Sequence, residues 1–169
     1  KWLGRITASK QKLPHATFQA RHVMTGPDID EPMLATVGHI RSALELDEGV
    51  TLEPGDIVLH GRAWSGANAI KSVDVCIERL VGPGSWTPVW KPAWRPAQLL
   101  AKPEPLVWAR FEIPWSGVEP GRYRIMTRAR DESGNVQPRP EDVVWNQQGL
   151  GYNGHAPVEV AVAVPTMMP

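Results

Sequence analysis

Apolar residues alternate with polar or small residues along several stretches of this chain. The clearest stretch is 158–164, where valine occupies every second position. Similar alternation runs through 73–77 and 107–113. Because successive side chains of a strand point to opposite faces, this pattern predicts strands with one buried face. Turn-forming residues separate the stretches, and none of them has the spacing of a strong amphipathic helix.

Two further predicted strands are entered through the same tripeptide. Glu53-Pro54-Gly55 precedes a strand at 57–63, and Glu119-Pro120-Gly121 precedes a strand at 122–130. Proline fixes one φ angle of such a turn, and glycine accepts the positive φ that other residues avoid. Repeated turn-to-strand units favour a sheet protein over a helical array.

The second of these units also follows the tyrosine-corner spacing of immunoglobulin-type sandwiches. Its pattern is Glu119-x-Gly121-x-Tyr123-x-Ile125, with Ile125 at the place of the disulfide cysteine in antibody domains. These patterns together predict an all-β fold. We expect an immunoglobulin-like (E-set type) β-sandwich of about seven strands with an extended N-terminal arm. On its inner faces we expect Val107 and the Val158 to Val164 series.

Composition agrees with such a fold and narrows the functional classes. The 169 residues include 17 prolines and 15 glycines, which suit a fold with many turns. The formal net charge is +0, so nothing favours nucleic acid as the main partner. The single cysteine excludes an internal disulfide, and no apolar run is long enough to span a membrane.

The chain divides into an irregular beginning and a patterned remainder. We predict an arm or linker with an edge strand over 1–48, the sandwich over 49–165 and a tail at 166–169. Residues 2–6 predict a short strand or linker, and residues 8–32 an arm packed over a surface. Within the sandwich, 81–105 predicts a long irregular excursion that carries three tryptophans.

Four blocks of this sequence resemble the C-terminal dimerisation domain of the sulfite oxidase family, the Mo-co oxidoreductase dimerisation domain. They are Gly61-Arg62-Ala63-Trp64-Ser65-Gly66, Ile70-Lys71-Ser72-Val73-Asp74-Val75, the run from Arg128 to Pro138, and Val144-Trp145-Asn146 followed by Gly151-Tyr152-Asn153. The resemblance extends over nearly the whole chain, to about Val164. It favours an edge strand within 36–46, which by propensity alone is also compatible with a helix.

The resemblance implies functions for a larger parent enzyme. That enzyme would carry molybdenum-molybdopterin on a catalytic domain upstream of Lys1, in cis or in trans, and none on this fragment. It would transfer an oxygen atom to or from a small oxyanion and pass electrons to a cytochrome. The resemblance further implies a homodimer and a periplasmic location.

Single residues with reactive or ligating side chains offer little chemistry on their own. Cys76 lies in a predicted strand without a nearby His or Lys to lower its pKa, so we interpret it as structural. The five histidines lack metal-ligand spacing. The acidic run 131–135 lacks the ligand spacing of a calcium loop, and we interpret it as a turn. The sequence predicts no catalytic residue and no metal or cofactor site in this chain.

An arginine stripe on the strand after Gly121 admits two interpretations. Arg122, Arg124, Arg128 and Arg130 share one face, where they can bind an anion or carboxylates of a partner. The alternative is a solvated face balanced by Glu112, Glu119 and Asp131. We expect Arg128 and Arg130 to be candidates for domain or subunit contacts, together with Trp64 and Trp108.

The segment 145–149 departs from the family pattern. Sulfite-oxidising members typically carry an arginine there that reaches the anion pocket, whereas Gln148 stands at that place here. By the resemblance, Trp145, Asn146 and Gln148 are candidates for the border of the substrate pocket. The missing positive charge puts sulfite in doubt as the substrate.

Two functional hypotheses follow. The first is a dimerisation domain of a sulfite oxidase-like molybdenum oxidoreductase, itself without a catalytic residue. The second is a free-standing immunoglobulin-like binding module that associates through its aromatic residues. The tryptophans at 86, 90, 94, 108 and 115 are expected on the irregular excursion or on the opposite strand faces, and this surplus predicts a homodimer. The alternative is that the excursion folds back over its own sandwich and buries these rings within one chain.

Overall fold

The computed structural model describes residues 9–11 and 21–164. The predicted strand or linker at 2–6 and the predicted tail at 166–169 lie outside these residues. The described part of the predicted arm contains one short antiparallel pair, β1 (Val23–Met24) with β2 (Met33–Leu34).

Two compact units make up the chain. The first contains the residues up to Thr36 together with the distant segment Val144–Leu150. The second contains Val37–Val143 and the chain from Gly151 onward, and it holds the sandwich. The predicted boundary between 48 and 49 stays a prediction.

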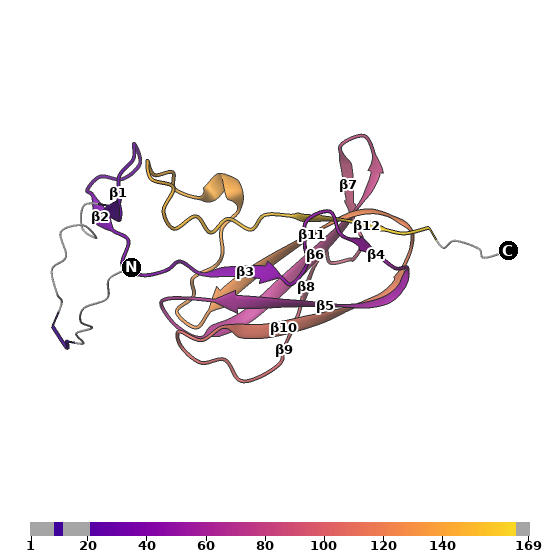
Figure 1. The fold of residues 1–169 in the computed structure, drawn as a ribbon, viewed down its shortest axis with the longest axis horizontal. Helices are drawn as coiled ribbons and strands as arrows, with labels where there is room; N and C mark the ends of the chain where they lie inside the picture. Colours follow the sequence, from indigo (N-terminus) through magenta and orange to yellow (C-terminus); the bar gives the residue numbers. More distant parts are fainter. Residues whose placement is uncertain (1–8, 12–20, 165–169) are drawn as a thin grey trace, which may run out of the picture. The chain divides into compact units, whose positions relative to one another are not determined.

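The second unit consists of two sheets, and Figure 1 shows their long strands stacked in layers. The four-stranded sheet has the order β3 (Arg41–Leu44), β5 (Gly55–Trp64), β10 (Ala109–Val118) and β9 (Gln98–Leu99). The other sheet has the order β4 (Thr51–Leu52), β12 (Val158–Val162), β11 (Gly121–Asp131), β6 (Ile70–Gly82) and β7 (Ser85–Pro88), with β8 (Trp94–Pro96) also paired to β6.

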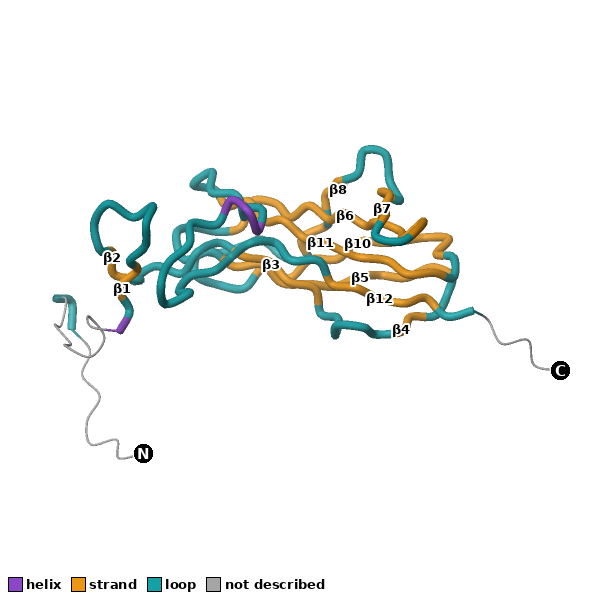
Figure 2. The backbone as a smooth tube through the Cα atoms, turned by 90° about the horizontal axis from the view of Figure 1, so that it is seen from above, coloured by secondary structure: helices purple, strands orange, loops and turns teal. Residues whose placement is uncertain are grey.

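Nearly all of these strands pair antiparallel, and only the short contact between β12 and β4 is parallel among the described residues. A 3-10 turn, η1 (Pro140–Asp142), follows the loop after β11. Seen from above in Figure 2, the long strands run side by side and loops join them at both ends of the sandwich.

The core fills the space between the sheets with the alternate side chains of the long strands. Strand β6 contributes Val73, Val75 and Ile77, all fully buried. Strand β10 faces them with Phe111 and Trp115, and β11 adds Ile125. Burial of each such side chain stabilises the fold by about 1.5–3 kcal/mol. The period-two alternation of the sequence therefore creates the two inner faces.

The predicted fold class is confirmed, including β3 within 36–46. The strand number is higher than the expected seven, because the two sheets hold ten strands within the described part of the chain. The extra ones are short: β7, β8 and β9 form inside the stretch 81–105, which we had expected to be irregular.

Three predicted placements were wrong. Val107 and Val164 are exposed, because β10 begins only at Ala109 and β12 ends at Val162. Trp115, expected outside the inner faces, is buried in the core. Proline has no backbone N–H to donate, yet β10 continues through Pro114. The pairing of β10 with β9 ends at Glu112, so among the described residues no strand on the β9 side is present to accept a hydrogen bond from position 114.

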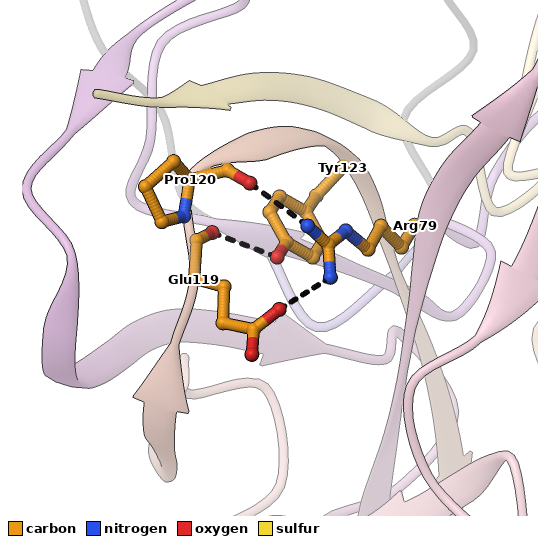
Figure 3. Close-up of polar contacts among 4 residues, drawn as sticks. All are labelled: Arg79, Glu119, Pro120 and Tyr123. Carbon is orange, nitrogen blue, oxygen red and sulfur yellow. Dashed lines mark hydrogen bonds and ion pairs between the residues drawn. The ribbon is translucent and has the colours of Figure 1, made fainter. Parts of the chain in front are cut away.

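The predicted tyrosine corner is confirmed in its atomic detail (Figure 3). The Tyr123 hydroxyl donates a hydrogen bond of 2.8 Å to the carbonyl oxygen of Glu119. The Arg79 guanidinium donates to the Pro120 carbonyl at 3.0 Å and to the Glu119 carboxylate at 2.6 Å. The Tyr123 ring meets Trp115 edge-on, with ring centroids 4.8 Å apart. This corner ties the β10–β11 turn to β6 and to the core.

Candidate functional site

The predicted pocket segment lies in the first unit, where it forms a compact turn. Asn146 is buried, and its side-chain amide donates to the Leu150 carbonyl at 2.8 Å. Its side-chain oxygen accepts a hydrogen bond from the Leu150 N–H, also at 2.8 Å. The Gly149 N–H donates to the Asn146 carbonyl at 3.0 Å. These bonds close the turn on itself, so Asn146 has a structural role within it.

The same turn leaves Gln148 and Trp145 exposed. Among the described residues of its unit, it contacts those just after β1. The Gln147 N–H donates to the Thr25 carbonyl at 2.8 Å, and Gly26 lies directly against the Trp145 backbone. Sequence reasoning missed Thr25 and Gly26, because no sequence pattern connects positions more than a hundred residues apart. The role of Trp145, Asn146 and Gln148 at a pocket stays a prediction.

The arginine stripe on β11 is largely neutralised within the chain. Arg128 pairs with Asp74 at 3.1 Å, Arg124 pairs with Glu78, and Arg122 pairs with Glu159 at 2.8 Å. These acids are not the predicted set of Glu112, Glu119 and Asp131. The cross-strand register decides the outcome, since it places Glu78 opposite Arg124 and Asp74 opposite Arg128.

Tryptophans of the excursion cover two of these arginines. The Arg124 guanidinium lies 4.8 Å from the Trp86 ring centroid, and that of Arg128 lies 4.5 Å from the Trp94 ring centroid. Arg130 is exposed, and no ion pair to it is found among residues 21–164. Arg130 is therefore the member of the stripe with its charge most available, and its role as a contact stays a prediction.

Cys76 lies beneath the same cover and does not fit a molybdenum ligand. It is 2% exposed and pairs across the sheet with Met126 on one side and Trp94 on the other. Burial raises the pKa of its thiol to about 11, which is the setting of an inert structural cysteine. Within the described residues, no group of three or more His, Cys, Asp or Glu side chains could hold a metal ion.

Trp64 and Trp108 come together at one end of the four-stranded sheet. Their ring centroids are 6.2 Å apart, on the outer side of the paired ends of β5 and β10. Leu106, with its left-handed φ of 62°, turns the chain so that consecutive apolar side chains face outward. Leu106, Val107 and Trp108 are 65%, 52% and 49% exposed. We call Trp64, Leu106, Val107 and Trp108 the aromatic patch.

The acidic run after β11 is a turn, as predicted. The fully buried Asp131 accepts hydrogen bonds from the Ser65 hydroxyl at 2.7 Å and from the backbone and side-chain nitrogens of Asn135 at 2.9 Å. Burial acts to raise the pKa of Asp131, but these hydrogen bonds outweigh it and hold the pKa below its usual value. The carboxylate therefore stays ionised and fixes the turn that leads toward η1.

Among the described residues, no helix is both long and apolar enough to cross a membrane. The fold and its surfaces define an immunoglobulin-like sandwich with a confirmed tyrosine corner, a largely internally paired arginine face and the exposed aromatic patch.

The chain belongs to the Mo-co oxidoreductase dimerisation domain family, whose model matches residues 40–163. It is 26% identical over 172 residues to mitochondrial sulfite oxidase of Rattus norvegicus, covering 96% of this chain and 30% of that protein. It is 27% identical over 164 residues to sulfite oxidase of Gallus gallus, covering 89% and 33%. The chain thus spans about a third of the length of these relatives.

A solved structure shares the fold. The sulfane dehydrogenase SoxCD from Paracoccus pantotrophus superposes with a TM-score of 0.66 at 22% identity, over 85% of this chain and 35% of that one. The match of the family model confirms the predicted family. The chain is a dimerisation domain of the sulfite oxidase-like type, and the alternative of a free-standing binding module is not supported.

Proposed function

We propose that this chain serves as the dimerisation domain of a molybdenum-dependent oxidoreductase that acts on a small oxyanion. The observation that carries the proposal is the family match over 40–163. In the whole enzyme, molybdenum-molybdopterin would be held by an upstream domain, in cis or in trans, and would supply oxygen-atom transfer. A cytochrome would accept the electrons. A periplasmic location belongs to the same proposal and rests on the family resemblance.

Within that enzyme, the turn 146–150 would border the substrate pocket. The exposed Gln148 side chain has donor and acceptor atoms but no charge. A charge-assisted hydrogen bond to a dianion contributes about 1.5–3 kcal/mol in a desolvated site. Gln148 in place of arginine therefore favours a substrate oxyanion whose binding needs a positively charged side chain less than the binding of sulfite does.

Substitution in the parent enzyme tests this placement. Gln148→Arg should bind sulfite about 10-fold more tightly or better, because 1.4 kcal/mol corresponds to a factor of ten. The gain should shrink as ionic strength rises if the site is partly open to solvent. Gln147→Arg, which adds the same charge one residue earlier in the turn, is the matched control. Equal Michaelis constants for sulfite in Gln148→Arg and the unaltered enzyme would remove Gln148 from the pocket.

The dimer itself would form through the aromatic patch. Aromatic side chains are enriched at stable interfaces, and a two-fold contact uses the same patch on both chains. Light scattering on a size-exclusion peak tests the association of this chain at tens of micromolar. A mass near the 18.7 kDa of one chain would contradict the homodimer.

A further inference from the structure

We infer that the backbone of Thr25 and Gly26 supports the turn 146–150, and we call these two residues the seat of the turn. The seat sets the position of Gln148, so Thr25 and Gly26 are positioning residues for oxyanion binding. This inference rests on the proposed function, since it concerns the same pocket segment. Its evidence lies wholly within the first unit, in the contacts between the residues after β1 and the turn 146–150.

The first step is the stiffness of the turn. Both polar atoms of the Asn146 side chain bond to the backbone of Leu150, and the Asn146 carbonyl accepts from Gly149. Gln148 lies inside this closed ring of hydrogen bonds. The backbone of Gln148 is consequently fixed within the turn, and it changes place mainly when the whole turn moves.

The second step is the contact that holds the turn. The Gln147 N–H, immediately before Gln148, donates to the Thr25 carbonyl at 2.8 Å. A Cβ atom at position 26 would lie 2.5 Å from the Trp145 carbonyl oxygen and 3.4 Å from the Cε3 atom of its ring. The turn thus rests on a backbone surface that has no room for a side chain.

The third step is that glycine is required here for space and not for its backbone angles. Gly26 is not among the glycines with positive φ. Real Cβ atoms essentially never approach closer than 3.0 Å, so alanine would displace the Trp145 backbone by at least about 0.5 Å. Because the obstacle is a backbone carbonyl, no rotamer change relieves it. The shift passes through Gln147 to Gln148.

The affinity test is a double-mutant cycle in the parent enzyme. Sulfite affinity is measured in the unaltered enzyme, in each single variant (Gly26→Ala and Gln148→Arg) and in the double variant. The gain in affinity from Gln148→Arg should be at least about 3-fold smaller when Gly26→Ala is present, because misplaced contacts lose binding steeply. The turnover number should change less than the Michaelis constant. Gly82→Ala is the matched control, since a Cβ there would meet only Ser85, at 3.9 Å. A full gain retained in the double variant would overturn the inference.

Hydrogen exchange in the same enzyme separates failure of the inference from failure of the proposed function. Gly26→Ala should speed exchange of the Gln147 N–H about 5-fold or more, while the Leu150 N–H, bonded inside the ring, should change little. Unchanged Gln147 exchange would overturn the seat whatever the kinetics show. Faster Gln147 exchange without any effect of Gln148→Arg on sulfite binding would keep the seat but reject the pocket.

A second variant covers a folding defect in Gly26→Ala. Asn146→Ala removes both side-chain hydrogen bonds to Leu150 and adds no charge near the oxyanion. It should loosen the ring, speed Leu150 exchange and reduce the sulfite affinity gained through Gln148→Arg. An undiminished gain in this variant would contradict the claim that the turn fixes Gln148.

Discussion

The tryptophans of this chain divide into a covered group and an exposed group. Trp90 and Trp115 are buried, and the rings of Trp86 and Trp94 lie beside Arg124 and Arg128. Trp108 and Trp145 expose about half of their surface or more. Both groups look alike in the sequence, since each residue lies in or beside an irregular stretch.

The difference shows what decides whether an aromatic side chain is available to a partner. The excursion folds back onto β6 through β7 and β8, so its tryptophans find cover within the chain. Trp108 has only Trp64 as an aromatic neighbour within 21–164. The expectation that all five tryptophans lie outside the inner faces was wrong for Trp90 and Trp115, which are buried in the core. Trp86 and Trp94 lie outside it but are covered by contacts within the chain. The case for association now rests on the aromatic patch.

Removal of a covered tryptophan should give the largest effect. Trp115→Ala should destabilise the fold by about 3–5 kcal/mol, because it leaves a cavity beside Tyr123. Urea unfolding measures this change, with Trp108→Ala as the control for loss of an exposed ring. A difference between the two variants of less than about 1 kcal/mol would erase the distinction between the groups.

Removal of the cation beside a covered ring should give an intermediate effect. Arg128→Ala loses both the Trp94 contact and the Asp74 ion pair, so we expect a destabilisation of about 1–2 kcal/mol. Arg122→Ala is the matched control, because that arginine has an exposed ion pair to Glu159 and, among the described residues, no ring contact. Equal thermal stability of the two variants would show that the rings add nothing.

A charge in the exposed group should affect folding least. Trp108→Glu should change the stability of the monomer by about 0.5 kcal/mol or less, as expected for a surface position. It should weaken dimerisation by about 10-fold or more, because a carboxylate would be desolvated in the interface. Sedimentation equilibrium measures the amounts of monomer and dimer, and urea unfolding measures the stability of the fold. Val58→Glu, on an exposed position of the same sheet, controls for added charge; a destabilisation like that of Trp115→Ala would place Trp108 in the core.

Sequence reasoning succeeded where one local rule determines the structure. The tyrosine corner depends on the spacing of Glu119 and Tyr123 within a single turn and strand, and both ends of its hydrogen bond follow from that spacing. Alternation likewise identified the buried faces of β6 and β12. The family resemblance supplied the edge strand β3, which propensity alone left open.

Sequence reasoning failed where the outcome depends on register or on long-range contacts. The partners of Arg124 and Arg128 are set by the alignment of β11 with β6, which no local pattern encodes. Val107 follows a strand pattern, but Leu106 adopts a left-handed conformation and the strand begins two residues later. The seat of the 146–150 turn joins segments far apart in the chain, so Gly26 gave no signal of its own.

Because Cys76 is buried, the rate at which its thiol is alkylated reports how often the sheet around it opens. Cys76 is the single cysteine, so a thiol-alkylating reagent can modify only this position. With a pKa of about 11, roughly one thiol in a thousand is ionised at pH 8, which slows the reaction before any steric protection is counted. Trp94 of β8 pairs directly across from Cys76, so detachment of that edge strand would expose the thiol to the reagent. The alkylation rate in dilute urea would time the detachment of β8 separately from global unfolding.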